Sequence, residues 1–92
     1  METIILDGAS ASTRAALHDQ LAQKLSFPDY YGRNLDALYD LLTERPESTR
    51  LLIRRRAALM EALGVYGASF LKTLEEASLE NPLFQVAFEE ET

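Results

Sequence analysis

Apolar positions along the chain follow two periods, and their order predicts strands that alternate with helices. Short apolar runs at residues 3–6 and 51–53, and large apolar residues at every second position over 84–88, predict three strands. Leu17, Leu21 and Leu25 recur at helical spacing and predict a helix over about residues 13–25. Similar spacing predicts further helices over about residues 35–43, 57–63 and 68–80.

Polar residues and glycine mark where these helices begin and end. Ser10 or Ser12 is expected to cap the first helix, because a short side-chain oxygen can accept the free N–H groups of the first turn. Asn34 is the expected cap of the second helix, with Asp36 near the positive end of its dipole. Gly64 is the expected C-terminal cap of the third helix.

The resulting order is strand, helix pair, strand, helix pair, strand. Each connection is long enough for a right-handed crossover, so the three strands can run parallel. Arg50 and Arg54 point to the same side as Leu52, which predicts one partly exposed sheet face and helices that cover mainly the other. The sequence therefore predicts a single two-layer α/β domain over residues 1–92, with a small three-stranded parallel sheet packed by about four helices.

Charge and composition narrow the possible partners. The net charge of −6 argues against nucleic acid and anionic membranes and favours a basic protein partner. The chain has no cysteine, so disulfides and thiolate metal sites are excluded. Its first residues lack the features of a signal peptide, and no apolar segment is long enough to span a bilayer. We expect a cytoplasmic protein that is monomeric when free and needs no cofactor or metal.

The helix predicted over residues 35–43 has an unusual polar side. Its leucines fall on one stripe, whereas the opposite arc carries Asp36, Tyr39, Asp40 and Thr43. Asp36 and Asp40 are four residues apart, where like charges repel by about 0.2–0.5 kcal/mol. A merely solvated surface explains the aspartates but gives no reason for Tyr39 beside them. A rigid aromatic next to carboxylates is typical of a binding hot spot.

Other polar residues favour structural roles. His18 lies beside the leucine stripe of the first helix, so we expect a hydrogen-bonded structural residue; no nucleophile or orienting partner accompanies it, and we expect no enzymatic activity. Two aspartates alone are weak indications of paired acids or of a metal site. The arginines at 54–56 lack interleaved aromatics, which favours a solvated strand end or local acidic contacts over nucleic-acid binding. Residues 89–91 are expected to form a solvated acidic tail.

The segment over residues 27–43, with the sequence FPDYYGRNLDALYDLLT, resembles the barstar family, intracellular inhibitors of barnase-type ribonucleases. The match is dense and almost gapless there. Weaker similarity covers most of the remaining chain, at Asp7-Gly8, Leu17-His18, Tyr66-Gly67-Ala68 and Glu75-Glu76-Ala77. The resemblance implies a parallel three-stranded sheet packed by helices. It also implies a basic ribonuclease partner and an immunity or antitoxin role.

The resemblance further implies roles for single positions. Asp40 would be the central carboxylate, in the place of an RNA phosphate, and Tyr30 would pack on the catalytic histidine of the ribonuclease. Glu76 would be a second acidic contact, with Glu75 as the alternative because the spacing after Gly67 differs by about one residue. The remaining contacts implied by the match are Asn34, Asp36, Tyr39 and Thr43.

Three departures from the family pattern bear on partner choice. Tyr39 replaces a tryptophan that is usual in the family, Arg33 replaces a residue that is often acidic, and Glu44-Arg45 follows Thr43 where the type member has Gly-Trp. Arg33 and Arg45 are expected to flank the contact surface and weaken its negative potential. A ribonuclease or toxin other than barnase therefore stays open as the target. So does a non-catalytic acidic interaction module that binds a basic non-nuclease protein.

Overall fold

The computed structural model describes residues 1–89 of the chain and has the predicted order of elements. The strands are β1 (Glu2–Asp7), β2 (Thr49–Arg54) and β3 (Phe84–Phe88). The helices are α1 (Arg14–Lys24), α2 (Leu35–Glu44), α3 (Arg56–Leu63) and α4 (Val65–Glu80), with a short 3-10 turn at Gly8–Ser10. Helix α4 begins three residues earlier than expected, because Gly64 at φ 55° ends α3 and starts α4 without a spacer.

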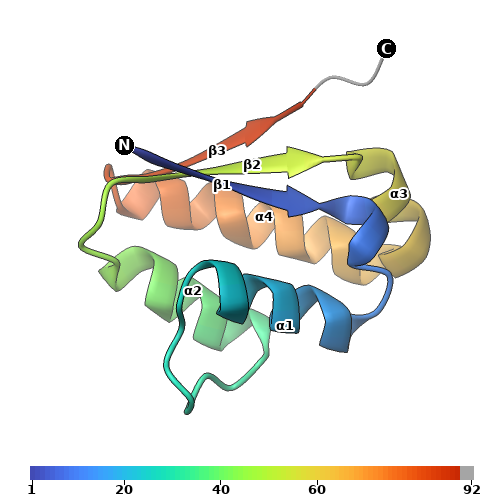
Figure 1. The fold of residues 1–92 in the computed structure, drawn as a ribbon, viewed down its shortest axis with the longest axis horizontal. Coiled ribbons are helices and arrows are strands. Elements are labelled where there is room, and N and C mark those ends of the chain that lie inside the picture. The colour runs from blue at the N-terminus through green and yellow to red at the C-terminus, as the bar shows by residue number, and fades with distance from the viewer. Residues whose placement is uncertain (90–92) are drawn as a thin grey trace.

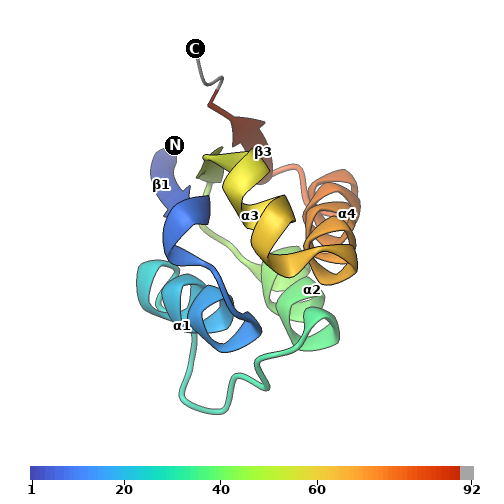
Figure 2. The same cartoon turned by 90° about the vertical axis from the view of Figure 1, so that its right-hand side faces the viewer.

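The three strands form one parallel sheet in the order β1-β2-β3, with β2 in the centre. Helices α1, α2 and α4 lie on one face of this sheet, and α3 lies at the end where the strands finish (Figures 1 and 2). Within residues 1–89, the opposite face carries no helix (Figure 1). The predicted two-layer α/β architecture is thereby confirmed.

The core lies between the sheet and the three covering helices. On β2, Leu51 and Ile53 are buried against the helices, while Arg50 and Arg54 are exposed on the open face, as the alternation predicts. The helices contribute a second set of fully buried side chains, namely Leu17, Leu21, Leu38, Leu42, Phe70 and Leu74. The leucine stripe of α2 is therefore buried, as predicted, and it packs the helix against the rest of the domain.

Capping confirms one prediction and corrects another. Asn34 caps α2: its Oδ1 accepts a hydrogen bond from the Ala37 N–H at 2.8 Å. Neither Ser10 nor Ser12 caps α1; Thr13 does, through Oγ1 and the Ala16 N–H at 3.0 Å. The physical reason is the 3-10 turn after β1, which takes up Ser10 and delays the start of the helix.

His18 joins three separate segments beneath the surface. Its Nδ1 lies 2.5 Å from the hydroxyl oxygen of Tyr31, in the loop between α1 and α2, and its Nε2 lies 2.6 Å from that of Tyr66 on α4. Burial, and then the charge of Arg33, lowers the pKa of His18, although Asp19 opposes this. A neutral imidazole donates through one nitrogen and accepts through the other, so both nitrogens are satisfied. The expected structural role of His18 is confirmed.

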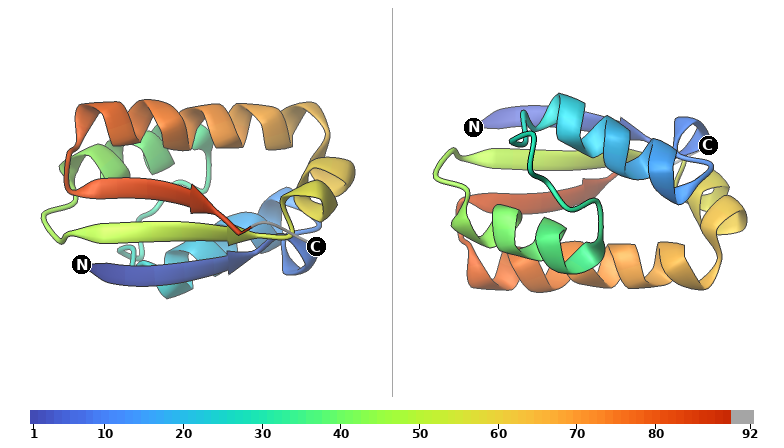
Figure 3. Two further views of the ribbon diagram at one scale, coloured as in Figure 1. Left: turned by 90° about the horizontal axis from the view of Figure 1, so that it is seen from above. Right: turned by 90° about the horizontal axis from the view of Figure 1, so that it is seen from below.

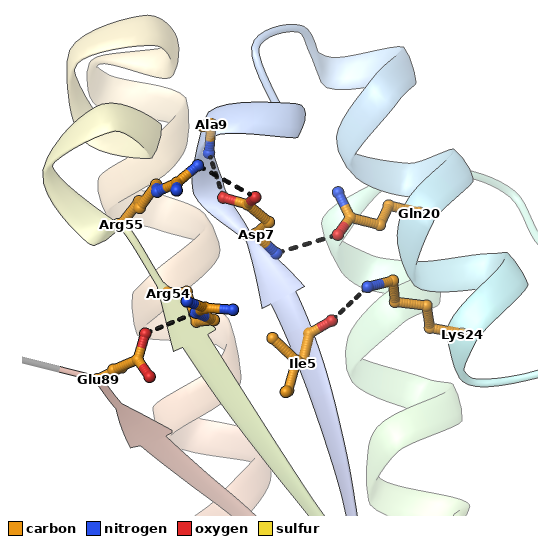
Figure 4. A network of polar contacts seen from close by, with 8 residues as sticks. All are labelled: Ile5, Asp7, Ala9, Gln20, Lys24, Arg54, Arg55 and Glu89. Atoms are coloured by element: carbon orange, nitrogen blue, oxygen red, sulfur yellow. Dashed lines mark hydrogen bonds and ion pairs between the residues drawn. The ribbon is translucent and has the colours of Figure 1, made fainter.

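The ends of the strands carry a network of polar contacts (Figure 4). Arg54 pairs with Glu89 at 2.5 Å and Arg55 with Asp7 at 3.4 Å, so the arginines make the expected local acidic contacts. Glu89, predicted as part of a tail, is tied to the sheet, and the other two tail residues lie outside the described range. Within residues 1–89, no helix has the length and hydropathy to cross a membrane.

Side-chain contacts from α1 occupy the outer edge of β1. The Lys24 ammonium donates to the Ile5 carbonyl at 2.5 Å, and Gln20 Oε1 accepts from the Asp7 N–H at 3.0 Å. Both backbone groups point away from β2 (Figure 4). An unpaired strand edge invites pairing with other chains, and these two side chains cover part of that edge at β1.

The two sides of α2 predict different costs of truncation. Leu38 is fully buried, whereas Tyr39 is half-buried at the margin of the core. We expect Leu38→Ala to lower the free energy of unfolding by about 2–5 kcal/mol, and Tyr39→Ala to lower it by less. Urea denaturation of both variants measures the difference. A larger loss for Tyr39→Ala would mean that the assigned faces of α2 are reversed.

The buried His18 predicts how stability depends on pH. Its pKa is lowered from the ordinary 6.5, so the unfolded chain binds this proton more readily than the folded one. Stability should be independent of this group above pH 6.5 and should fall as the pH drops below it. Denaturant melts between about pH 7.5 and 5.5, where carboxylates stay ionised, would reveal the slope. His18→Gln should flatten it; equal slopes in both proteins would contradict the role.

Candidate partner-binding surface

Helices α2 and α4 lie side by side and run in the same direction (Figure 3). Their outer sides carry the exposed carboxylates of Asp36, Asp40 and Glu76, with the half-buried ring of Tyr39 among them. We call these four residues the acidic face. Partial burial raises the pKa of Tyr39, as do the nearby carboxylates of Glu80, Glu76 and Asp40. Negative charge from both helices therefore converges on one aromatic ring.

A shallow hollow of about 250 Å³ runs between the two helices at this face. Asp36 and Tyr39 line it from α2, and Thr73 and Glu76 line it from α4. Glu75 instead lines a different hollow, beside β3. The structure thus places Glu76, and not Glu75, at the same hollow as Asp36 of α2.

A second hollow of about 260 Å³ lies between α2 and the loop before it. Tyr30 and Gly32 border it from the loop, and Asp40 and Glu44 border it from α2. Tyr30 is 82% exposed, whereas the adjacent Tyr31 is 6% exposed because its hydroxyl is bound to His18. Buried Tyr31 therefore anchors the loop, and Tyr30 is left to project beside Asp40.

The charged side chains of the acidic face form no ion pairs with other residues in the described part of the chain. The described part of the chain contains four ion pairs, and none involves Asp36, Asp40 or Glu76. Asn34 and Thr43 differ, because both already have partners. The Asn34 amide donates to the Gly32 carbonyl at 3.2 Å besides capping the helix, and the Thr43 hydroxyl donates to the Asp40 carbonyl at 3.1 Å. These two residues shape the surface from within.

Arg33 and Arg45 are both engaged with their own chain, which revises their expected effect on this surface. Arg33 pairs with Asp19 of α1. The side chain of Arg45 is only 13% exposed: it donates at 2.9 Å to the Thr49 hydroxyl and to the Leu25 carbonyl. These hydrogen bonds therefore hold its guanidinium at the start of β2 instead of on the outer side of α2.

The sequence did not indicate one residue that positions α2 relative to α4. Asn81 follows α4 and is 6% exposed, and its amide nitrogen donates to the carbonyls of Leu42 and Arg45 at 2.9 and 3.0 Å. It thereby pairs with the Arg45 carbonyl just beyond α2 and adds a second donor to the Leu42 carbonyl, which also accepts from the Arg45 N–H at 3.4 Å. In the sequence Asn81 marked only the end of a helix, and nothing local pointed to this contact.

Glu44 was also missed as part of the surface. It is exposed, borders the hollow beside Tyr30 and follows Asp36 and Asp40 at intervals of four residues. The helical spacing could have placed it on the same side. Residues 1–89 contain no group of three or more histidine, cysteine, aspartate or glutamate side chains arranged to hold a metal ion.

Comparison with known proteins agrees with this architecture. Residues 1–89 match the family described as Barstar (barnase inhibitor). The chain is also 42% identical over 81 residues to the "Putative ribonuclease inhibitor YrdF" of Bacillus subtilis (strain 168), an alignment that covers 87% of this chain and 89% of that protein. The family match covers nearly the whole chain, and the fold, the loop and the paired helices agree with it. The chain therefore belongs to the barstar family.

Proposed function

We propose that this protein inhibits a ribonuclease by inserting the acidic face and the loop of Tyr30 into the active site of that enzyme. One observation carries the proposal: two helices present three exposed carboxylates without internal partners around Tyr39. Membership of a family of barnase inhibitors, and a relative named as a ribonuclease inhibitor, support the same conclusion.

Substitution for RNA phosphate explains the chemistry of the face. A ribonuclease must hold phosphates with fixed cationic groups, and carboxylates on rigid helices can occupy those positions without offering a bond to cleave. The hydrogen bond between a carboxylate and a cationic group is stronger than one between neutral groups, particularly where water is excluded. The net charge of −6 also favours rapid encounter with a basic enzyme. The chain itself performs no reaction, so the proposal assigns it no enzymatic activity.

Individual roles follow from position. Asp40 borders the hollow beside Tyr30, its charge also acts on Tyr39, and it would take the central phosphate position. Tyr30 would stack on an active-site side chain of the partner. Asp36 and Glu76 would hold cations at the rim, on either side of the hollow between the helices. Asn34 and Thr43 would add polar contacts at the margin.

The setting follows from the same proposal. An inhibitor of a secreted ribonuclease protects the producing cell while the enzyme is still inside, so we place this protein in the cytoplasm, as a monomer until it meets its target. Barnase and related ribonucleases or toxins are the candidate targets.

The central role of Asp40 predicts a large loss of inhibition. We expect the native protein to suppress RNA cleavage by barnase or another secreted basic ribonuclease at equimolar ratio. Asp40→Asn should weaken binding at least about 30-fold, which is the smallest effect that defines a hot-spot residue. The barnase–barstar interface is itself one of the reference cases for such residues. Inhibition titrations and calorimetry measure the change.

The matched control is Glu61→Gln, which removes the same charge from exposed α3. It should bind like the native protein. Equal affinities for Asp40→Asn and Glu61→Gln against a confirmed target would refute the assigned surface. Tight binding of a basic protein without nuclease activity, with no ribonuclease inhibited, would favour an interaction module instead.

The two adjacent glutamates of α4 provide a second test. Glu76 lines the hollow of the acidic face, and Glu75 lines the hollow beside β3. Glu76→Gln should therefore weaken inhibition about five- to tenfold, whereas Glu75→Gln should leave it unchanged. Both changes conserve shape and remove one charge from the same helix. If Glu75→Gln weakened inhibition more than Glu76→Gln in one titration series, the contact would lie on the side of α4 that faces β3, and the assignment of Glu76 would be wrong.

A further inference from the structure

The outer edge of β3 has backbone groups without partners. The Thr49 N–H donates to the Leu83 carbonyl at 2.8 Å, and the Glu89 N–H donates to the Ile53 carbonyl at 3.0 Å. Because alternate residues of a parallel strand bond to the same neighbour, the odd-numbered residues of β3 face β2. Val86 and Phe88 therefore direct their N–H and C=O groups outward, and no hydrogen bond within residues 1–89 occupies them.

This edge differs from the other edge of the sheet. At β1, side chains of α1 bond to the outward-facing backbone groups of Ile5 and Asp7. Strand β3, with the sequence FQVAF, has neither a proline nor a lysine that would discourage pairing. Side chains therefore cover part of the β1 edge, whereas the β3 edge is open to an additional strand.

An apolar hollow of about 520 Å³ adjoins the open edge. Its apolar lining comes from Met60, Leu71, Val86 and Phe88. In the view from above, α4 lies outside β3 and forms a ledge alongside the edge (Figure 3). Side chains alternate across a strand, so every second side chain of an added strand would point toward this hollow.

The charges at the hollow indicate what such a strand would carry. Arg56 and Lys72 line it against the single carboxylate of Glu75, a local excess of positive charge in an acidic protein. The Arg56 guanidinium lies 4.5 Å above the ring of Phe88, at the strand itself. A carboxylate next to an apolar side chain complements both features.

We propose that the β3 edge binds an extended segment of another protein as a fourth strand. Its backbone would pair with Val86 and Phe88, an apolar side chain would fill the hollow, and an acidic side chain would face Arg56 and Lys72. A second copy of this chain fits less well, because its own α4 would project into the same space as the first. The surface lies beside β3, away from the acidic face, and does not depend on ribonuclease inhibition.

The test selects peptides and then removes one backbone donor. A random heptapeptide phage library is selected on the immobilised full chain, and enriched peptides are synthesised for fluorescence anisotropy and for NMR titration of the ¹⁵N-labelled protein. We expect sequences that alternate apolar residues and contain an acidic one, and that shift the amide resonances of Val86 and Phe88. Val86→Pro removes only an outward N–H and should weaken binding at least about tenfold.

Two further variants keep the outcome decisive. Lys72→Glu leaves the strand intact and should also weaken binding at least about tenfold. Thr3→Pro removes an outward N–H from the opposite edge and should leave binding unchanged. The proposal fails if no such peptide is enriched, if enriched peptides bind Val86→Pro and Lys72→Glu as tightly as the native protein, or if they shift only the acidic face. Assays of RNA cleavage stay independent of this result.

Discussion

The relative placement of α2 and α4 depends on one buried amide. Asn81 follows α4 and donates both of its amide protons to carbonyls at the end of α2, so the C-termini of two parallel helices share a single side chain. Leaving the part-buried Arg45 carbonyl unpaired would cost about 1–3 kcal/mol, which makes the contact specific as well as stabilising. Because the acidic face takes its carboxylates from both helices, the spacing between Asp40 and Glu76 follows from this contact. The leucines beneath then hold the pair to the sheet.

At the other end of the surface, His18 performs a comparable task for the loop. Its two nitrogens bind Tyr31 and Tyr66, so the loop before α2 is tied to α1 and to the start of α4. Tyr30 therefore projects from a segment whose neighbour is fixed. For the proposed inhibitor, order that exists before binding reduces the conformational entropy lost on association. The same burial that fixes Tyr31 disfavours charge on His18, so the neutral network suits neutral pH.

Local patterns in the sequence predicted most of the fold and the outward side of α2, because period and capping act over a few residues. Asn34 caps its own helix, and the leucine stripe defines which side of α2 is buried. Contacts between distant residues were beyond such reasoning. Arg45 reaches Leu25, and Asn81 reaches Leu42, over separations that no local pattern encodes. Which of Glu75 and Glu76 lies on the side of α4 that faces α2 likewise depends on tertiary packing, and the cap at Thr13 depends on the 3-10 turn before it.

The unequal edges of the sheet also limit how copies of this protein can associate. A fibre in which the sheets of successive molecules join edge to edge needs two free sheet edges on each molecule. One edge pairs with the preceding molecule, and the other pairs with the next one. Lys24 and Gln20 occupy backbone positions on the outer border of β1, so a copy that docked at β3 through that border would have to break their hydrogen bonds first. Growth in one dimension is thereby disfavoured from the first step.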